Sequence, residues 1–136
     1  MAERPMPETD TGAKAFWEGS ANGKLLIQRC DGCDCYQHYA RPFCTKCGSH
    51  KLSMVEAKGR GVVYSFTVIH RGAYDDIPSP YVVALVTLDE GPRLLTNIVN
   101  CDPGDIRCDM PVNVTFQPLR DGIVLPVFEP FLSSRA

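Results

Sequence analysis

Five cysteines lie close together in the segment CDGCDCYQHYARPFCTKC, residues 30–47. Two pairs within it have the spacing Cys-x-x-Cys, and the residues between the pairs suffice for a hairpin that brings four thiolates to one point. Four thiolates at a tetrahedral point are the ligands of a structural zinc site, which leaves no coordination position for water or substrate. The spacing therefore predicts one structural zinc ion with four ligands: Cys30, Cys33, Cys44 and Cys47.

Other uses of the same thiols remain open. Cys35 competes with Cys33 for one coordination position, and the symmetry of two Cys-x-x-Cys pairs favours Cys33. Iron fits four sulfur ligands too and would make the protein an electron carrier, although zinc is favoured where no other redox feature is present. Disulfides are disfavoured, because each pair would close a small strained loop in a compartment that keeps thiols reduced. His50 is interpreted as a surface residue.

The rest of the chain offers little for catalysis. No Gly-x-Ser-x-Gly elbow, phosphate loop or dinucleotide fingerprint occurs. Asp75 and Asp76 are adjacent in the polar segment RGAYDDIPSP and are interpreted as solvated loop residues, while His70 has no recognisable partner nucleophile. Cys101 and Cys108 are isolated and receive no role. The sequence therefore predicts a chain without catalytic residues of its own.

Composition is that of a small globular protein. The chain has 136 residues, with 44% hydrophobic and 22% charged residues, both near globular averages. A net charge of -2 predicts no strong attraction to polyanions. The N-terminal sequence MAERPMPETDTGAK is acidic and proline-containing where a signal peptide has a basic start and an apolar run. Since no apolar stretch reaches the roughly 20 residues of a membrane span, a cytoplasmic protein without membrane contact is expected.

The elements that position the cysteines are mainly β-strands. A short helix is expected from Thr11 through AKAFWEGSANGK, capped by Asp10 or Thr11 and ended by Gly23. The segments after it are rich in β-branched and aromatic residues and are separated by Gly, Pro and Asp. Those segments are LLIQR, KLSMVE, GVVYSFTVIHR, PYVVALVTL, PRLLTNIVN, PVNVTFQ and IVLPVF.

About five strands after residue 56 suit a small closed barrel, and an OB-fold β-barrel is expected there. Within GVVYSFTVIHR, alternation predicts that four side chains share one face: Val62, Tyr64, Phe66 and Val68. Gly59 and Gly61 mark a sharp bend or a close backbone approach. Three units are predicted: a lead-in and helix at 1–28, a zinc ribbon at 29–55 and an OB-fold domain at 56–136.

Taken together, the motifs resemble those of a known family. The chain is similar to the zinc-ribbon and OB-fold proteins catalogued as domain of unknown function thirty-five. The strings that carry the resemblance extend from Phe16 to Pro130: FWEG, GKLLIQRC, RPFCTKCGS, GRGVVYSFTVIHR, PYVVALVTLDEGPRLL, MPVNVTF and LPVFEP. Two departures are the extra Cys35 and the pair Cys108-Asp109 before Met110, where the family commonly has a glycine.

The resemblance implies an N-terminal helix, a rubredoxin-like zinc ribbon and a C-terminal OB barrel. It also implies an accessory subunit of a thiolase-superfamily enzyme that acts on acyl-coenzyme A: a thiolase, an acyltransferase or a thiolase-fold aldolase. The partner would carry the catalytic residues, and a two-plus-two complex is expected by analogy. The residues offered for partner binding are Phe16, Trp17 and Tyr74.

Basic residues around the ribbon and the first barrel strand fit the phosphates of coenzyme A. Those offered for acyl-coenzyme A binding are Lys58, Arg60 and Arg71. The alternative function is a module that binds single-stranded nucleic acid, with aromatic candidates for base stacking: Tyr64, Phe66, Tyr74 and Tyr81. A pI near 5.9 argues against the basic groove that such a module needs.

Overall fold

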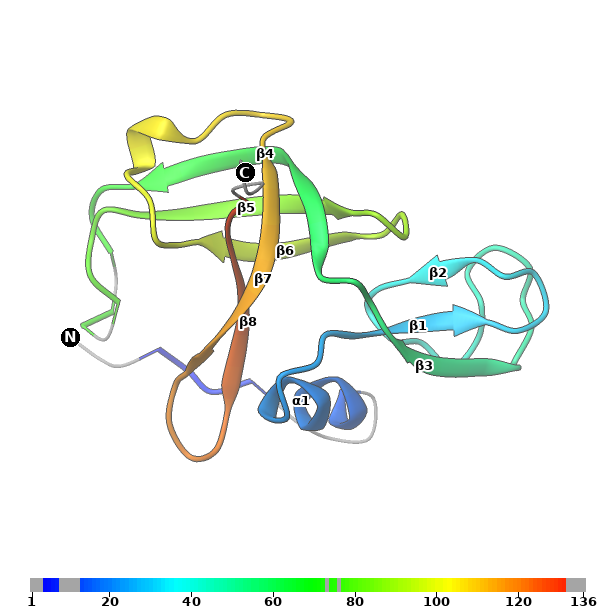
Figure 1. Cartoon of the computed structure of the whole chain (residues 1–136). Helices are drawn as coiled ribbons and strands as arrows, with labels where there is room; N and C mark the ends of the chain where they lie inside the picture. The colour runs from blue at the N-terminus through cyan, green and yellow to red at the C-terminus, as the bar shows by residue number, and fades with distance from the viewer. Residues whose placement is uncertain (1–3, 8–12, 73, 76, 132–136) are drawn as a thin grey trace.

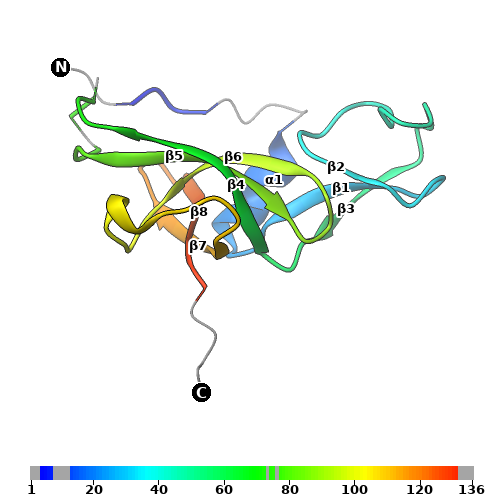
Figure 2. The same cartoon turned by 90° about the horizontal axis from the view of Figure 1, so that it is seen from above.

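The computed structural model describes residues 4–7, 13–72, 74–75 and 77–131. Within these ranges the fold is mainly β, with one α-helix, a short 3-10 helix (η1), a small three-stranded sheet and a closed five-stranded barrel. The sheet and the barrel lie side by side, and the helix lies between them (Figures 1 and 2). The elements are α1 (Lys14–Ala21), β1 (Leu26–Cys30), β2 (Tyr36–Gln37), β3 (Leu52–Glu56), β4 (Arg60–Ile69), β5 (Tyr81–Leu88), β6 (Arg93–Ile98), η1 (Pro103–Asp105), β7 (Pro111–Pro118) and β8 (Val124–Pro130).

Helix α1 ends at Ala21, and Gly23 terminates it as expected. This glycine has a φ of +76°, its N–H donates to the carbonyl of Ser20 at 3.0 Å, and the next N–H donates to the carbonyl of Gly19 at 2.9 Å. The two bonds form a Schellman motif, which requires a left-handed residue that glycine adopts without a Cβ clash. The predicted capping residues, Asp10 and Thr11, lie outside the described residues.

The small sheet carries the cysteine segment. Its strand order is β2-β1-β3, and both pairings are antiparallel. Ile27 and Cys30 of β1 are buried, and the buried Leu25 precedes the strand. Because β1 is the central strand and ends at Cys30, the sheet fixes the start of the cysteine segment. We call residues 26–56 the ribbon.

The barrel has the strand order β4-β5-β6-β8-β7 and closes through the antiparallel pairing of β4 with β7. Strands β6 and β8 are parallel neighbours, with Ile98 opposite Phe128. Five strands in this Greek-key order form an OB-type barrel, which confirms the predicted fold class. Its core is built from alternate residues of β5 together with the fully buried Val63, Val112 and Phe128.

Gly59 and Gly61 stand where strands approach closely. Gly59 has a φ of +80°, and a Cβ there would lie 2.5 Å from Cγ1 of Val114. A Cβ on Gly61 would lie 2.3 Å from the carbonyl oxygen of Thr87. The positive φ of Gly59 fits the expected sharp bend, and the contact of Gly61 confirms the expected close backbone approach.

The prediction that four alternate side chains share one face of β4 is wrong for the first half of the strand. The side chains of Val62 and Tyr64 are exposed, while Val63 is fully buried; beyond them, Phe66 and Val68 pack against the core. The register with β5 shifts between residues 63 and 65, so that Tyr64 is an extra residue in a β-bulge. A one-residue bulge exchanges the inward and outward faces, which unbroken alternation cannot anticipate.

Among the described residues, no helix has the length and apolar character needed to cross a membrane.

Candidate metal centre and binding surfaces

The structure brings together the sulfur atoms of Cys30, Cys33, Cys44 and Cys47. All four lie within 4.8 Å of one another. The Sγ atoms of Cys30 and Cys47 are 3.6 Å apart, and those of Cys33 and Cys44 are 3.7 Å apart. Four sulfurs at 2.3 Å from a central zinc ion would be separated by about 3.8 Å along each edge of a tetrahedron. The spacing of these thiols therefore fits a tetrahedral zinc ion.

The two Cys-x-x-Cys loops have the same backbone hydrogen bonds. In the first loop, Asp34 N–H donates to the Cys30 carbonyl at 2.8 Å, and Cys30 N–H donates to the Cys35 carbonyl at 2.8 Å. In the second loop, the equivalent bonds run from Gly48 N–H to the Cys44 carbonyl at 2.9 Å, and from Cys44 N–H to the Ser49 carbonyl at 2.8 Å. Superposing the two patterns makes Cys35 equivalent to Ser49.

This equivalence separates Cys33 from Cys35. The residue after each pair has a positive φ, +62° at Asp34 and +80° at Gly48, and this left-handed turn directs the chain away from the sulfur cluster. Cys35 stands beyond that turn and lies outside the group of four close sulfurs. His50 also lies outside this group, and its Nδ1 is 3.1 Å from the carbonyl oxygen of Pro42.

The pKa values of two of the four thiols are shifted in opposite directions. Amide N–H groups of Cys47 and Lys46 donate to Sγ of Cys44 at 3.4 and 3.3 Å, and these bonds lower the pKa of Cys44 to about 6. The Ser49 amide lowers the pKa of Cys47, but the sulfurs of Cys30 and Cys33 outweigh it and raise that pKa to about 12. The first thiolate therefore forms readily, whereas formation of a second thiolate beside it costs free energy. A bound divalent cation removes that cost.

Two glutamines, which the sequence did not identify, hold the second cysteine loop in place. The side chain of Gln28 donates to the Arg41 carbonyl and accepts from the Arg41 N–H, both at 2.9 Å. The side chain of Gln37 accepts from the Thr45 N–H at 3.0 Å. Gln28 is buried in β1, and a buried polar side chain requires a hydrogen-bond partner.

The residues offered for acyl-coenzyme A binding do not form one cluster. Lys58 and Arg60 are both exposed near the start of β4, where the guanidinium carbon of Arg60 lies 4.6 Å from the centre of the Phe131 ring. Arg71 follows the other end of β4. At about 3.3 Å per strand residue, Arg60 and Arg71 are separated by more than 30 Å of extended chain.

The residues offered for partner binding are also split. Phe16 and Trp17 lie together on α1, with ring centroids 5.0 Å apart in an edge-to-face arrangement. Both are partly buried, and Phe16 also packs against the core. Tyr74 belongs to the connection between β4 and β5, which lies at the end of the barrel away from the ribbon (Figure 1).

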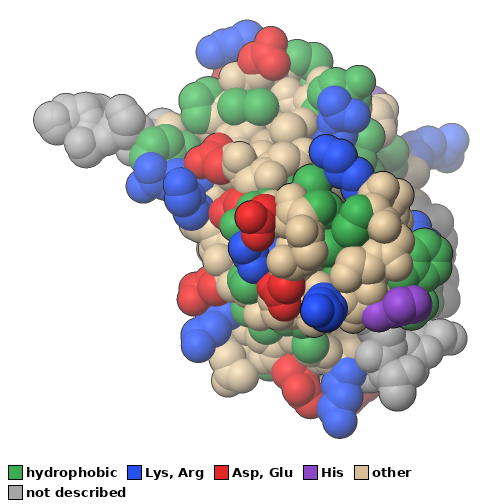
Figure 3. All heavy atoms as spheres, turned by 90° about the vertical axis from the view of Figure 1, so that its right-hand side faces the viewer, with side chains coloured by type: hydrophobic (Ala, Val, Ile, Leu, Met, Phe, Trp, Pro, Cys, Tyr) green, Lys and Arg blue, Asp and Glu red, His purple; other side chains and the backbone are tan. Residues whose placement is uncertain are grey.

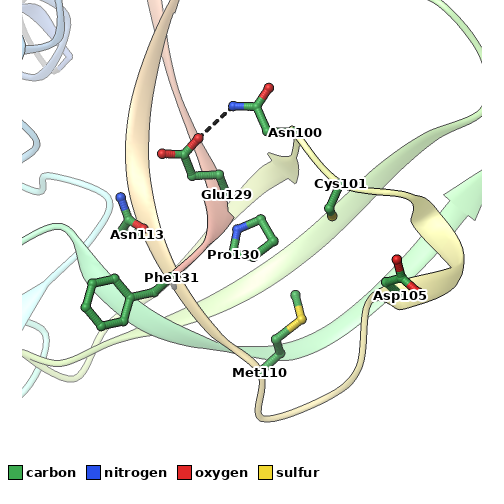
Figure 4. Close-up of a pocket in the computed structure, with 8 residues that line it drawn as sticks. All are labelled: Asn100, Cys101, Asp105, Met110, Asn113, Glu129, Pro130 and Phe131. Carbon is green, nitrogen blue, oxygen red and sulfur yellow. Dashed lines mark hydrogen bonds between the residues drawn. The ribbon is translucent and has the colours of Figure 1, made fainter. Parts of the chain in front are cut away.

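A hollow with a volume of 710 Å³ lies beside the end of β8 (Figure 4). Asn100 donates to Glu129 across it at 2.6 Å. Asp105 and Glu129 contribute carboxylates, and no lysine or arginine among the described residues lines it. Burial and the nearby Asp105 and Asp102 raise the pKa of Cys101, which also lines this hollow. The site is therefore unsuited to phosphate groups and to a reactive thiolate.

The remaining candidates lie apart from these sites. His70 is exposed directly after β4, as expected for a residue at a strand end. Asp75 is exposed in the connection to β5, and Asp76 lies outside the described residues. Cys108 is exposed in the connection between η1 and β7.

Two family models match the chain in succession. The model described as "ChsH2, rubredoxin-like zinc ribbon domain" matches residues 17–53. The model described as "ChsH2, C-terminal OB-fold domain" matches residues 54–117. The order of the two matches is the order of the ribbon and the barrel in the structure.

Relatives are found in bacteria and archaea. A "Probable enoyl-CoA hydratase alpha subunit" of Thermomonospora curvata is 42% identical over 95% of this chain, and the chain spans 40% of that protein's length. A "DUF35 domain-containing scaffold protein" of Methanocaldococcus jannaschii is 31% identical over 74% of this chain and 75% of its own length.

A solved structure has the same architecture. It is titled "Ltp2-ChsH2(DUF35) aldolase", and one of its chains is 39% identical to this chain with a TM-score of 0.84. The similarity covers 93% of this chain and 98% of that one. On the combined evidence of cysteine geometry, barrel topology and these matches, the chain belongs to the DUF35 family of zinc-ribbon and OB-fold proteins.

Proposed function

We propose that this chain is a non-catalytic accessory subunit that binds a thiolase-superfamily enzyme acting on acyl-coenzyme A. The partner is a thiolase, an acyltransferase or a thiolase-fold aldolase. The complex is cytoplasmic and contains two copies of each subunit, a two-plus-two complex. The observation that carries the proposal is the likeness, over nearly the full length of both chains, to a chain of the structure titled "Ltp2-ChsH2(DUF35) aldolase". The names of other relatives, such as a hydratase subunit and a scaffold protein, support the same class of role.

Zinc is proposed to be structural. The four sulfurs of Cys30, Cys33, Cys44 and Cys47 would complete its coordination shell and leave no position for a water nucleophile. When bound, the ion would cross-link the two cysteine loops. Those loops, the glutamines that brace them and α1 then form one rigid surface beside the barrel.

A binding experiment with the Ltp2 aldolase subunit of the related complex tests the partner. We expect a stable complex in size-exclusion chromatography with light scattering, and a higher aldolase rate than with Ltp2 alone. Trp17→Ala should weaken the complex at least tenfold, because buried tryptophans often dominate interfaces. Tyr36→Ala removes a ribbon aromatic that is 37% exposed and serves as the matched control. A chain that neither binds Ltp2 nor changes its rate contradicts the proposal.

Acyl-coenzyme A contact is proposed for Lys58 and Arg60 as one site and for Arg71 as another. Calorimetry of the complex with acetyl-coenzyme A should show weaker binding for the double variant Lys58→Ala/Arg60→Ala, since each lost charge removes a phosphate contact. Arg107→Ala changes an exposed arginine in the connection after η1 and is the control. Equal affinities of the double variant and the control would remove these two residues from the site.

Binding of single-stranded nucleic acid has less support. Phe66, one of the proposed stacking residues, packs against the barrel core. Tyr64 is half-exposed and is covered by the guanidinium group of Arg93, 3.7 Å from its ring centre. On the face that carries the ribbon, basic and acidic side chains are interspersed (Figure 3). A nucleic-acid groove needs a continuous basic track, and oligonucleotide binding that weakens steeply with salt would restore this alternative.

A further inference from the structure

Two adjoining hollows lie where α1, the ribbon and the barrel meet. The larger, with a volume of 280 Å³, lies between α1 and the ribbon and is lined in part by Met54. The smaller, with a volume of 160 Å³, lies between α1 and strands β6 and β8 and is lined in part by Leu95. Four residues line both: Phe16, Trp17, His38 and Tyr39.

The four shared residues form a continuous aromatic wall. Phe16 is 5.0 Å from Trp17 and 5.2 Å from His38 between ring centroids, and His38 is 4.0 Å from Tyr39. Flat rings pack well against such walls, either offset or edge-to-face. The aromatic lining therefore favours a flat ring as the occupant.

His38 supplies one unused polar atom to this apolar place. Its Nε2 is shielded from solvent and has no hydrogen-bond partner among the described residues. A buried polar atom without a partner is unfavourable, so a ligand that offers one gains affinity there. A hydroxyl group can donate to a neutral imidazole nitrogen or accept from it, and it therefore suits either tautomer of His38.

The charge of the lining excludes ionic ligands. Among the residues that the structure describes, no lysine, arginine, aspartate or glutamate lines either hollow. Burial lowers the pKa of His38 to about 4, so this side chain is neutral at pH 7 as well. An anion such as a nucleotide phosphate would lose its hydration without gaining a counter-charge.

The volumes limit the occupant to one or two rings. A cavity of about 150 Å³ lined by apolar side chains binds a benzene molecule. The smaller hollow, at 160 Å³, therefore accepts a single ring, and the larger, at 280 Å³, accepts a fused pair.

We propose that these hollows form a binding site for an uncharged one- or two-ring compound that carries a hydroxyl group. The rings pack among Phe16, Trp17 and Tyr39, and the hydroxyl group pairs with Nε2 of His38. The site belongs to the free chain, so it stands or falls independently of the proposed partner enzyme.

Nuclear magnetic resonance of the zinc-loaded full chain tests the site directly. Trp17 is the only tryptophan, so the single indole N–H signal reports on the wall of both hollows. We expect 2-naphthol to shift this signal saturably. We expect 2-methylnaphthalene, which lacks the hydroxyl group, to bind about tenfold more weakly, and 2-naphthoate, which is anionic, to leave the signal unchanged. This comparison uses the unaltered protein and requires no variant to fold.

A pair of variants isolates the role of His38. His38→Leu should weaken 2-naphthol binding about tenfold and leave binding of 2-methylnaphthalene unchanged. The control is His50→Leu, because His50 is also beside an aromatic ring, 6.4 Å from Phe43 between centroids, but does not line the hollows. His50→Leu should bind both probes as the original chain does.

Three results would overturn the proposal or one of its parts. If the indole signal does not shift at the solubility limit of 2-naphthol, the proposal is overturned. The hollows would then be left for a partner's side chains. Equal binding of 2-naphthol and 2-methylnaphthalene overturns the assignment of the hydroxyl group to His38. Equal binding of 2-naphthoate overturns the argument from charge.

Discussion

At the scale of single residues, the position that follows each Cys-x-x-Cys pair determines which thiols meet. Asp34 and Gly48 both adopt a left-handed conformation and both donate to the carbonyl of the first cysteine in their loop. Asp34 also forms a solvent-exposed salt bridge with Arg29. Cys35 is placed beyond the turn and outside the close sulfurs.

Zinc content of cysteine variants follows from this geometry. Cys33→Ser should lose most of the bound zinc, because three sulfurs then remain of a four-sulfur shell. Cys35→Ser should keep one zinc ion per chain, as should the control Cys108→Ser, which changes an exposed thiol. Mass spectrometry of metals after gel filtration measures the ratio. Zinc loss in Cys35→Ser with retention in Cys33→Ser would reverse the assignment.

His38 couples stability to pH through its buried ring. Its pKa is about 4 in the folded chain and about 6.5 when unfolded, so the unfolded state binds more protons between these values. Stability should therefore fall as pH falls from 6.5 towards 4, by at most about 3 kcal/mol from this group. Urea unfolding at several pH values measures the loss.

A variant separates this effect from acid release of zinc. His38→Phe keeps an aromatic ring and the zinc ligands but has no titrating group. The unfolding free energy of the original chain minus that of His38→Phe should decrease as pH falls through this range, because only the original chain loses stability. Parallel curves for the two proteins would show that His38 does not contribute.

At the scale of elements, β4 is shaped by two local irregularities. Gly61 near its start lets β5 approach, and the bulge at Tyr64 reverses its faces. The result is a strand whose first half exposes Val62 and Tyr64 and whose second half directs Phe66 into the core. A long strand can thus close a narrow barrel and still fill its interior at both ends.

Replacement of Gly61 tests this account. In Gly61→Ala the new Cβ would meet the Thr87 carbonyl oxygen at 2.3 Å and Cγ1 of Val86 at 2.9 Å. Because the first of these is backbone, the strands must separate, and we expect a loss of about 2 kcal/mol in urea unfolding. Gly104→Ala, whose Cβ would have its nearest neighbour at 3.6 Å, should change stability by less than about 0.5 kcal/mol. Equal effects would contradict the close approach.

At the scale of the whole molecule, the ribbon and the barrel differ in what stabilises them. The barrel is closed and has its own buried core, with Val63, Val86 and Phe128 fully buried. The ribbon has a three-stranded sheet and few buried side chains beyond those of β1. Structures below about 40 residues generally need a metal or disulfides. The ribbon should therefore depend on zinc, and the barrel should not.

Removal of the metal with a chelator should unfold the cysteine segment selectively. Limited proteolysis should then cut within residues 31–50 while a fragment that contains the barrel survives, and added zinc should restore protection. Mass spectrometry of the fragments measures both. Resistance of residues 31–50 after metal removal, or loss of the barrel fragment, would contradict the division of stability. This experiment also tests the predicted units 1–28, 29–55 and 56–136.

The sequence by itself determined the mainly β fold and the set of cysteines that meet. Both depend on local rules: β-branched segments between turn residues form strands, and Cys-x-x-Cys spacing makes a loop tight enough to direct two sulfurs the same way. The C-terminal end of α1 was predictable for the same reason, because Gly23 supplies the left-handed residue locally.

Only the tertiary structure decided the rest. The bulge at Tyr64, the separation of Arg60 from Arg71 and the hollows around His38 all depend on which strands become neighbours. Residues 16, 38 and 95 are far apart in sequence, and their meeting is set by the packing of helix, ribbon and barrel. Sequence spacing carries information over one turn or one strand, whereas a binding site is formed where separate elements pack together.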